Sequence, residues 1–138
     1  MAIGEKIWEG KGKVTGTTVK SVGSDGASME FNAMAMLKGV GRHQGIEFRD
    51  VGTVTGTVRP GGILMGSGQG ILATQEGDTI AYKGLGVGRF EKGVMSAFIA
   101  FGTSSQKLSW MNSLIVLSEL KLDATSQEFT SEAHEWSV

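Results

Sequence analysis

Five polar residues occupy or border strands that are otherwise apolar, and a tryptophan stands in the one helical candidate. These six residues are Glu30, Asn32, Arg59, Arg89, Trp110 and Glu119. A few polar groups that converge in a mostly apolar cavity are what a small-molecule site requires. We therefore predict that these residues contribute to a site for a small apolar ligand.

Two of these residues have the chemistry for proton transfer. If Glu30 or Glu119 faces the interior of the fold, desolvation raises the pKa of its carboxyl group and makes it a proton donor or acceptor near neutral pH. Isomerisation or cyclisation of an apolar substrate is then an alternative to simple binding. A third alternative is a structural protein whose interior is filled by its own side chains. The pattern assigns no catalytic residue, so the choice between enzyme and binding protein stays open.

Several other kinds of chemistry find no support in the sequence. There are no cysteines, which excludes disulfides, thiolate metal sites and cysteine nucleophiles. Of the two histidines, His134 shares a strand face with Glu132, but neither histidine has metal-ligand spacing with other donors. No phosphate loop, metalloprotease pair or serine-hydrolase motif is present. We expect no metal and no cofactor.

The bulk properties predict one cytoplasmic domain. A chain of 138 residues fits a single domain over residues 1–138. The formal net charge of −1 gives no reason to expect nucleic acid or an anionic membrane surface as partner. The longest apolar runs, at 94–101 and 114–117, fall short of the roughly 18 residues of a membrane span. The first residues lack the layout of a signal peptide.

Alternation of apolar and polar residues predicts an all-β fold. The alternating segments are residues 5–22, 29–37, 46–58, 63–74, 79–90, 94–102, 113–123 and 128–136. Short turns join most of them, the clearest being Pro60 followed by Gly61, so the order is mostly a meander. About eight such strands leave long edges unless the sheet closes. We predict a closed antiparallel barrel, with a two-sheet sandwich as the alternative and a short helix near residues 104–112 plugging one end.

Glycines recur at alternate positions in two of these segments: Gly66, Gly68 and Gly70, then Gly84, Gly86 and Gly88. Each triplet lies on a single strand face. The spacing does not match a nucleotide loop, because a strand follows where a helix should begin. The favoured interpretation is that the bare backbone lets the sheet coil or lets a bulky neighbour lie across it, the candidates being Trp8, Trp110, Phe98 and Phe101. The alternative is that the missing side chains leave room for a ligand.

Some strands are apolar on both faces. In the 94–102 strand, Met95 and Ile99 lie on one face while Val94 and Phe98 lie on the other, and Met34 and Met36 extend the second surface. A barrel strand needs only its inner face to be apolar, so the outer one requires a cover. We predict a homo-oligomer. The alternative is that the short helix and the N-terminal segment cover these positions within one chain.

Motifs in the central part of the chain carry a family resemblance. They are the runs at residues 59–62, 66–70, 83–88 and 103–108, with Asn112. On these motifs the chain resembles a family of uncharacterised microbial proteins with a barrel like that of allene oxide cyclase. The resemblance implies an eight-stranded barrel, a trimer and an apolar lumen of the kind that holds an unsaturated fatty-acid epoxide. No catalytic motif of that family matches, so none of its catalytic residues is transferred.

Overall fold

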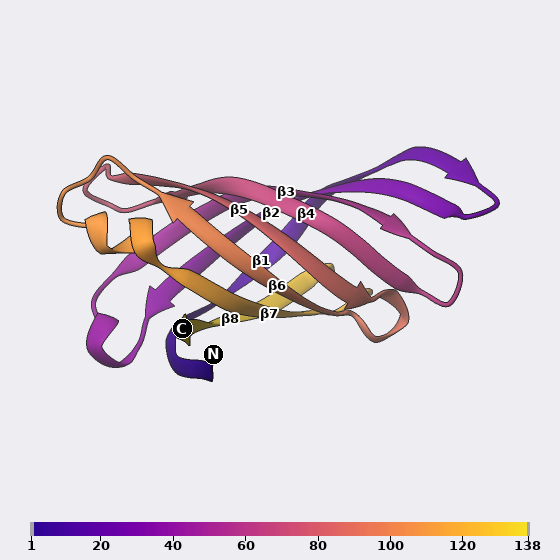
Figure 1. Cartoon of the computed structure of the whole chain (residues 1–138). Coiled ribbons are helices and arrows are strands. Elements are labelled where there is room, and N and C mark those ends of the chain that lie inside the picture. The colour runs from indigo at the N-terminus through magenta and orange to yellow at the C-terminus, as the bar shows by residue number, and fades with distance from the viewer. Residues whose placement is uncertain (1, 138) are drawn as a thin grey trace.

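The computed structural model describes residues 2–137 and shows eight antiparallel strands closed into a barrel (Figure 1). The strands are β1 (Ala2–Gly23), β2 (Gly26–Gly39), β3 (Glu47–Val58), β4 (Ile63–Ala73), β5 (Thr79–Arg89), β6 (Val94–Gly102), β7 (Ile115–Leu122) and β8 (Glu128–Ser137). Each strand pairs with its neighbour in the chain, and β8 pairs with β1. The predicted closed barrel is confirmed, the meander is complete, and the sandwich alternative is wrong.

Strand β1 is longer than the barrel wall. It pairs with β8 as far as Lys13 opposite Glu128, and beyond that point only with β2, up to Gly23 opposite Gly26. Register shifts between Val14 and Gly16 and again between Val19 and Ser21 bend this ribbon. As a result the β1–β2 hairpin projects from one end of the barrel (Figure 1).

The helix predicted near residues 104–112 is instead a short 3₁₀ helix, η3 (Ser109–Ser113). The side chain of Asn112 accepts a hydrogen bond from the Thr103 N–H at 2.7 Å and donates one to the Thr103 carbonyl at 3.1 Å. These two bonds tie the ends of the segment together, so little chain remains for a longer helix. Leu108 and Met111, three residues apart, suit the three-residue turn and are both buried. No helix within residues 2–137 is long and apolar enough to cross a membrane.

Aromatic and aliphatic side chains fill the end of the barrel that carries η3. Trp8 packs edge-on against Phe48 and Phe101, with ring centroids 5.7 and 5.6 Å apart. Leu108 and Met111 belong to the same buried cluster. The connection between β6 and β7 therefore supplies part of the core at this end.

Tyr82 lies across the bare backbone of the inner wall. A Cβ atom added at Gly70 would lie 2.6 Å from Tyr82 Cζ, and one added at Gly52 would overlap with the phenol oxygen. A bulky neighbour does cover glycine positions, as predicted, but the residue is Tyr82. Around Gly66, Gly84 and Gly86 a Cβ would instead meet backbone oxygens of adjacent strands at 2.7 to 2.8 Å, as in a tightly coiled sheet.

Gly68 differs from the other glycines of β4. The nearest atom to an added Cβ there is Val54 Cγ2 at 3.6 Å, which is an ordinary contact distance. Space therefore remains over Gly68 inside the barrel.

Alanine at Gly70 and at Gly68 is expected to change stability in opposite directions. Gly70→Ala places a Cβ 2.5 Å from the Val51 carbonyl oxygen and against the Tyr82 ring, and it is expected to cost about 1–3 kcal/mol. Gly68→Ala is expected to stabilise the fold by about 0.4–1 kcal/mol, because it restricts the unfolded chain. Urea denaturation of the two variants measures the difference, and equal effects would contradict the placement of Tyr82.

Candidate functional site

A cavity of about 140 Å³ lies inside the barrel beside the aromatic end. On the order of ten water molecules would fit in such a volume. Its wall is mostly apolar and includes bare backbone at Gly52, Gly66, Gly68, Gly84 and Gly86. The alternative interpretation of the glycine triplets, that missing side chains leave room in the lumen, describes this part of the wall.

A hydrogen-bonded pair of polar side chains lines this cavity. Tyr82 of β5 donates its phenol proton to Oδ1 of Asp50 on β3 at 2.7 Å. The two residues come from strands on either side of β4. Tyr82 stands in register with Gly70. Because Gly70 has no side chain, the phenol can reach across β4 to the carboxylate.

Burial dominates the electrostatics of the pair. It raises the pKa of the Asp50 carboxyl, and the hydrogen bond from Tyr82 opposes part of that rise. Burial also raises the pKa of the Tyr82 phenol, and the charge of Asp50 raises it further. The phenol therefore keeps its proton at neutral pH and acts as a donor to Asp50.

The six residues predicted from the sequence lie outside this cavity. Glu30 is on the outer wall, with Oε1 3.9 Å from Lys20 Nζ. The Asn32 side chain accepts a hydrogen bond from the Thr53 hydroxyl at 2.9 Å. Arg59 is exposed in the turn before β4, and Arg89 is exposed at the end of β5. The structure does not bring these four residues together.

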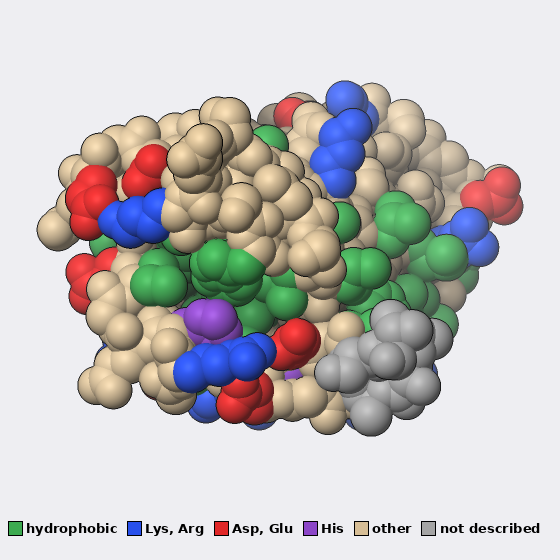
Figure 2. Space-filling view, turned by 60° about the vertical axis from the view of Figure 1, so that its left-hand side comes forward, with side chains coloured by type: hydrophobic (Ala, Val, Ile, Leu, Met, Phe, Trp, Pro, Cys, Tyr) green, Lys and Arg blue, Asp and Glu red, His purple; other side chains and the backbone are tan. Residues whose placement is uncertain are grey.

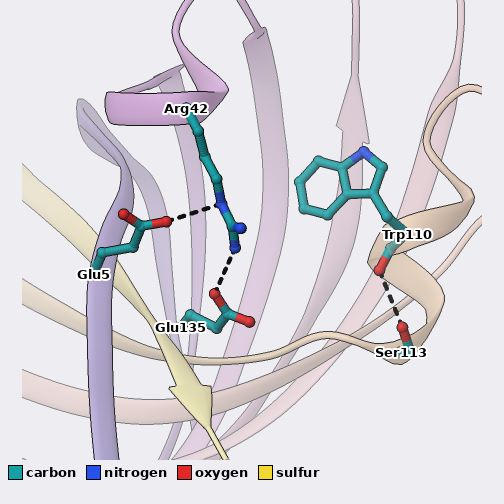
Figure 3. A network of polar contacts seen from close by, with 5 residues as sticks. All are labelled: Glu5, Arg42, Trp110, Ser113 and Glu135. Carbon is teal, nitrogen blue, oxygen red and sulfur yellow. Dashed lines mark hydrogen bonds and ion pairs between the residues drawn. The ribbon is translucent and has the colours of Figure 1, made fainter.

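Glu119 and Trp110 occupy two further places. Glu119 lies in an outer depression among charged side chains that include Lys11 and Lys121. Trp110 stacks on His43 at the η3 end, with ring centroids 4.6 Å apart. Beside it Arg42 bridges the carboxylates of Glu5 and Glu135 at 2.8 and 2.9 Å (Figure 3). Trp110 therefore lies beside ion pairs that connect Arg42 to β1 and β8, and not beside the lumen cavity.

Asp50 and Tyr82 escaped the sequence analysis, although a signal for them exists. Asp50 is in phase with Gly52, Val54 and Gly56, and Tyr82 is in phase with Gly84, Gly86 and Gly88. Once the glycine-bearing faces are assigned to the lumen, both residues face inward by the two-residue period. The sequence pattern did not by itself say which face was the inner one.

Comparison with known proteins identifies the fold. No family model matches the chain, and no curated protein does. A protein of unknown function from Clostridium acetobutylicum matches with a TM-score of 0.80 at 14% identity, covering 99% of this chain and 100% of that one. A conserved protein of unknown function from Rhodopseudomonas palustris gives 0.79 at 12% identity, with 98% of each chain covered.

A third solved structure is a beta-barrel like protein from Acinetobacter baumannii. Its TM-score is 0.79 at 15% identity, and the match covers 97% of this chain and 94% of that one. At such identities the likeness shows the barrel fold alone. The proteins from Clostridium acetobutylicum and Rhodopseudomonas palustris are themselves of unknown function, so they suggest no activity.

The raised pKa of Asp50 predicts a pH-dependent stability. The folded protein keeps the Asp50 proton at pH values where the unfolded chain, with an ordinary carboxyl pKa near 3.8, has released it. The protonated Asp50 carboxyl therefore contributes its full stabilisation below pH 3.8, and this contribution is lost as the pH rises through the folded pKa of Asp50. Asp50→Asn has no carboxyl group to titrate and so avoids this loss. We therefore expect the free energy of unfolding of the variant, relative to that of the wild type, to rise with pH between 3.8 and the folded pKa of Asp50 and to stay constant above it. Urea unfolding from acid to neutral pH measures it, and a difference independent of pH would contradict it.

Proposed function

We propose that the barrel binds a small, mainly apolar molecule in its lumen, between the glycine faces of β4 and β5. The cavity itself is the observation that carries this proposal: Gly66, Gly68, Gly84 and Gly86 line it with backbone, where larger side chains would fill it. Sites for small molecules are usually apolar hollows with a few placed polar groups. Asp50 and Tyr82 are such groups here.

The alternative of a barrel filled by its own side chains fits one end of the lumen. There Trp8, Phe48 and Phe101 pack against each other. Next to the glycines of β4 and β5 the lumen is not filled, since the cavity lies there. The inner wall thus favours a binding protein with a packed floor.

Proton-transfer catalysis is a second candidate, favoured by the position of Asp50. A carboxylate that lines an apolar cavity and has a raised pKa can remove a proton from one carbon of a bound molecule and return it to another. Such an isomerase or cyclase would use Asp50 in the role first assigned to Glu30 or Glu119. The resemblance to allene oxide cyclase, a cyclase with an apolar lumen, supports this candidate in shape alone.

The outer wall supports the proposal that copies of the chain associate. Outward side chains in the middle of β3 to β6 are uncharged apart from Lys83, whereas the flanking strands β2 and β7 carry Glu30, Glu119 and Lys121. Large side chains of the uncharged face are 46% to 71% exposed: Val51, Met65, Ile71, Leu85, Val87 and Phe98. Hydrophobic side chains are also exposed near the η3 end, between charged groups (Figure 2).

A second copy is the partner that suits this face. Four strands about 4.8 Å apart, each with roughly ten residues in it, span on the order of 600 Å². That area approaches the roughly 800 Å² that each partner buries in a stable complex. Because the face carries almost no charge, two copies of it meet without repulsion.

Filling the space over Gly68 is expected to abolish binding in the lumen. Gly68→Leu projects a side chain into the cavity from a position where an added Cβ meets nothing closer than 3.6 Å. Gly102→Leu is the matched control, because nothing lies within 4 Å of an added Cβ there and Gly102 does not line the cavity. Isothermal titration with 1-octanol measures binding. Binding that survives in Gly68→Leu, or that is lost in both variants, counts against the lumen as the site.

A charge on the outer face is expected to separate associated copies. Leu85→Lys places a cation at a side chain that is 71% exposed in the middle of the uncharged face. Val22→Lys is the control, because Val22 is 78% exposed on the projecting hairpin. Light scattering after size exclusion should show an oligomer for the wild type and Val22→Lys, and a smaller species for Leu85→Lys. A monomeric wild type would contradict self-association.

A further inference from the structure

One oxygen of the Asp50 carboxylate has no hydrogen-bond partner among the side chains that the structure describes. Oδ1 accepts the phenol proton of Tyr82, but Oδ2 accepts no hydrogen bond from residues 3–136. Within the same residues no polar side-chain atom is sealed away without a partner, so Oδ2 is not enclosed by protein. Asp50 lines the lumen cavity, and Oδ2 is therefore available to a molecule that enters it.

No positive charge compensates Asp50 within the described chain. Lys, Arg and His are all absent from the residues lining the cavity, and none of the ion pairs formed by residues 3–136 involves Asp50. A carboxylate in apolar surroundings is costly unless it is paired or fully hydrogen-bonded, and the hydrogen bond from Tyr82 offsets only part of that cost for Asp50. A bound molecule that brings a donor or a cation to Oδ2 relieves this cost.

Anionic ligands find no equivalent partner in the lumen. The phenol proton of Tyr82 is used by Asp50, and the high pKa of the phenol keeps that proton in place. Ser118 and Ser131, which also line the cavity, offer neutral hydroxyl groups. A ligand carboxylate would therefore lie near the charge of Asp50 with no cation to offset the repulsion.

We infer that the lumen selects molecules with an apolar body and one hydrogen-bond donor, an amine or a hydroxyl group, and that it rejects carboxylates. This inference rests on the lumen site proposed above and narrows its ligand class. Fatty acids and their epoxides carry a carboxylate, so this specificity differs from the one that the resemblance to allene oxide cyclase implies.

Three probes with the same eight-carbon chain test the selection: octylamine, 1-octanol and octanoate. Each is titrated into the full chain by calorimetry, at a pH above the titration of Asp50 found from the unfolding curves. We expect octylamine to bind most tightly and octanoate roughly tenfold or more weakly than octylamine, because hydrogen bonds to a charged group are the strong ones.

Two variants separate the contribution of Asp50 from that of charge in general. Asp50→Asn keeps an acceptor for Tyr82 and removes the charge, so the preference for octylamine over octanoate should disappear. Glu30→Gln removes an acidic group from the outer wall, where Glu30 faces Lys20, and should leave the preference unchanged. Gly68→Leu should abolish the binding of all three probes, so any binding that remains in this variant takes place outside the lumen.

The outcomes distinguish this inference from the proposed function. If octanoate binds as tightly as octylamine and Gly68→Leu abolishes both, the lumen site stands and the selection by Asp50 is wrong. The same holds if Asp50→Asn keeps the full preference for the amine. If none of the probes binds, or if Gly68→Leu binds them like the wild type, the lumen site fails and the inference falls with it.

Discussion

The lumen of this barrel depends on the lack of side chains along the inner faces of β4 and β5. Two-residue alternation places Gly66, Gly68 and Gly70 on one face and Gly84, Gly86 and Gly88 on one face of the next strand. In the closed barrel both faces point inward, since Gly66, Gly68, Gly84 and Gly86 line its cavity and Tyr82 covers Gly70. Bare backbone at these positions permits close approach of the strands, room for the Tyr82 ring and an unfilled volume over Gly68.

The same constraint explains why the polar pair exists. Tyr82 reaches Asp50 across β4 only because Gly70, between them, has no Cβ to block the ring. The pair then lies in the wall of a mostly apolar cavity, and burial raises the pKa of both groups. The missing side chain at Gly70 thus leads to a buried, hydrogen-bonded pair whose pKa values are raised.

The outer surface of the barrel is not uniform. Closure shields the inner faces of all strands from solvent, but the outer faces differ in charge and in exposed apolar area. On β1 and β7 the surface carries charged residues such as Lys11, Glu119 and Lys121, while on β5 and β6 the side chains of Leu85 and Phe98 expose apolar area. Three solved barrels share this fold at only 12% to 15% identity, so very different sequences suit one architecture. Fold and site are therefore separate questions in this protein.

Local pattern predicted the strands and their mostly sequential order, because alternation and tight turns act between near neighbours in the chain. It favoured closure, since long open edges are unfavourable, but left a sandwich as the alternative. It also placed the glycines on common faces. Tertiary structure decided which face is the lumen, that Tyr82 covers Gly70, and that residues 109–113 form a 3₁₀ turn held by Asn112 and Thr103. It also placed Glu30 and Glu119 on the outer wall and Asp50 at the cavity. These outcomes depend on contacts between strands distant in sequence, and a residue's type and spacing do not encode which distant side chain it will meet.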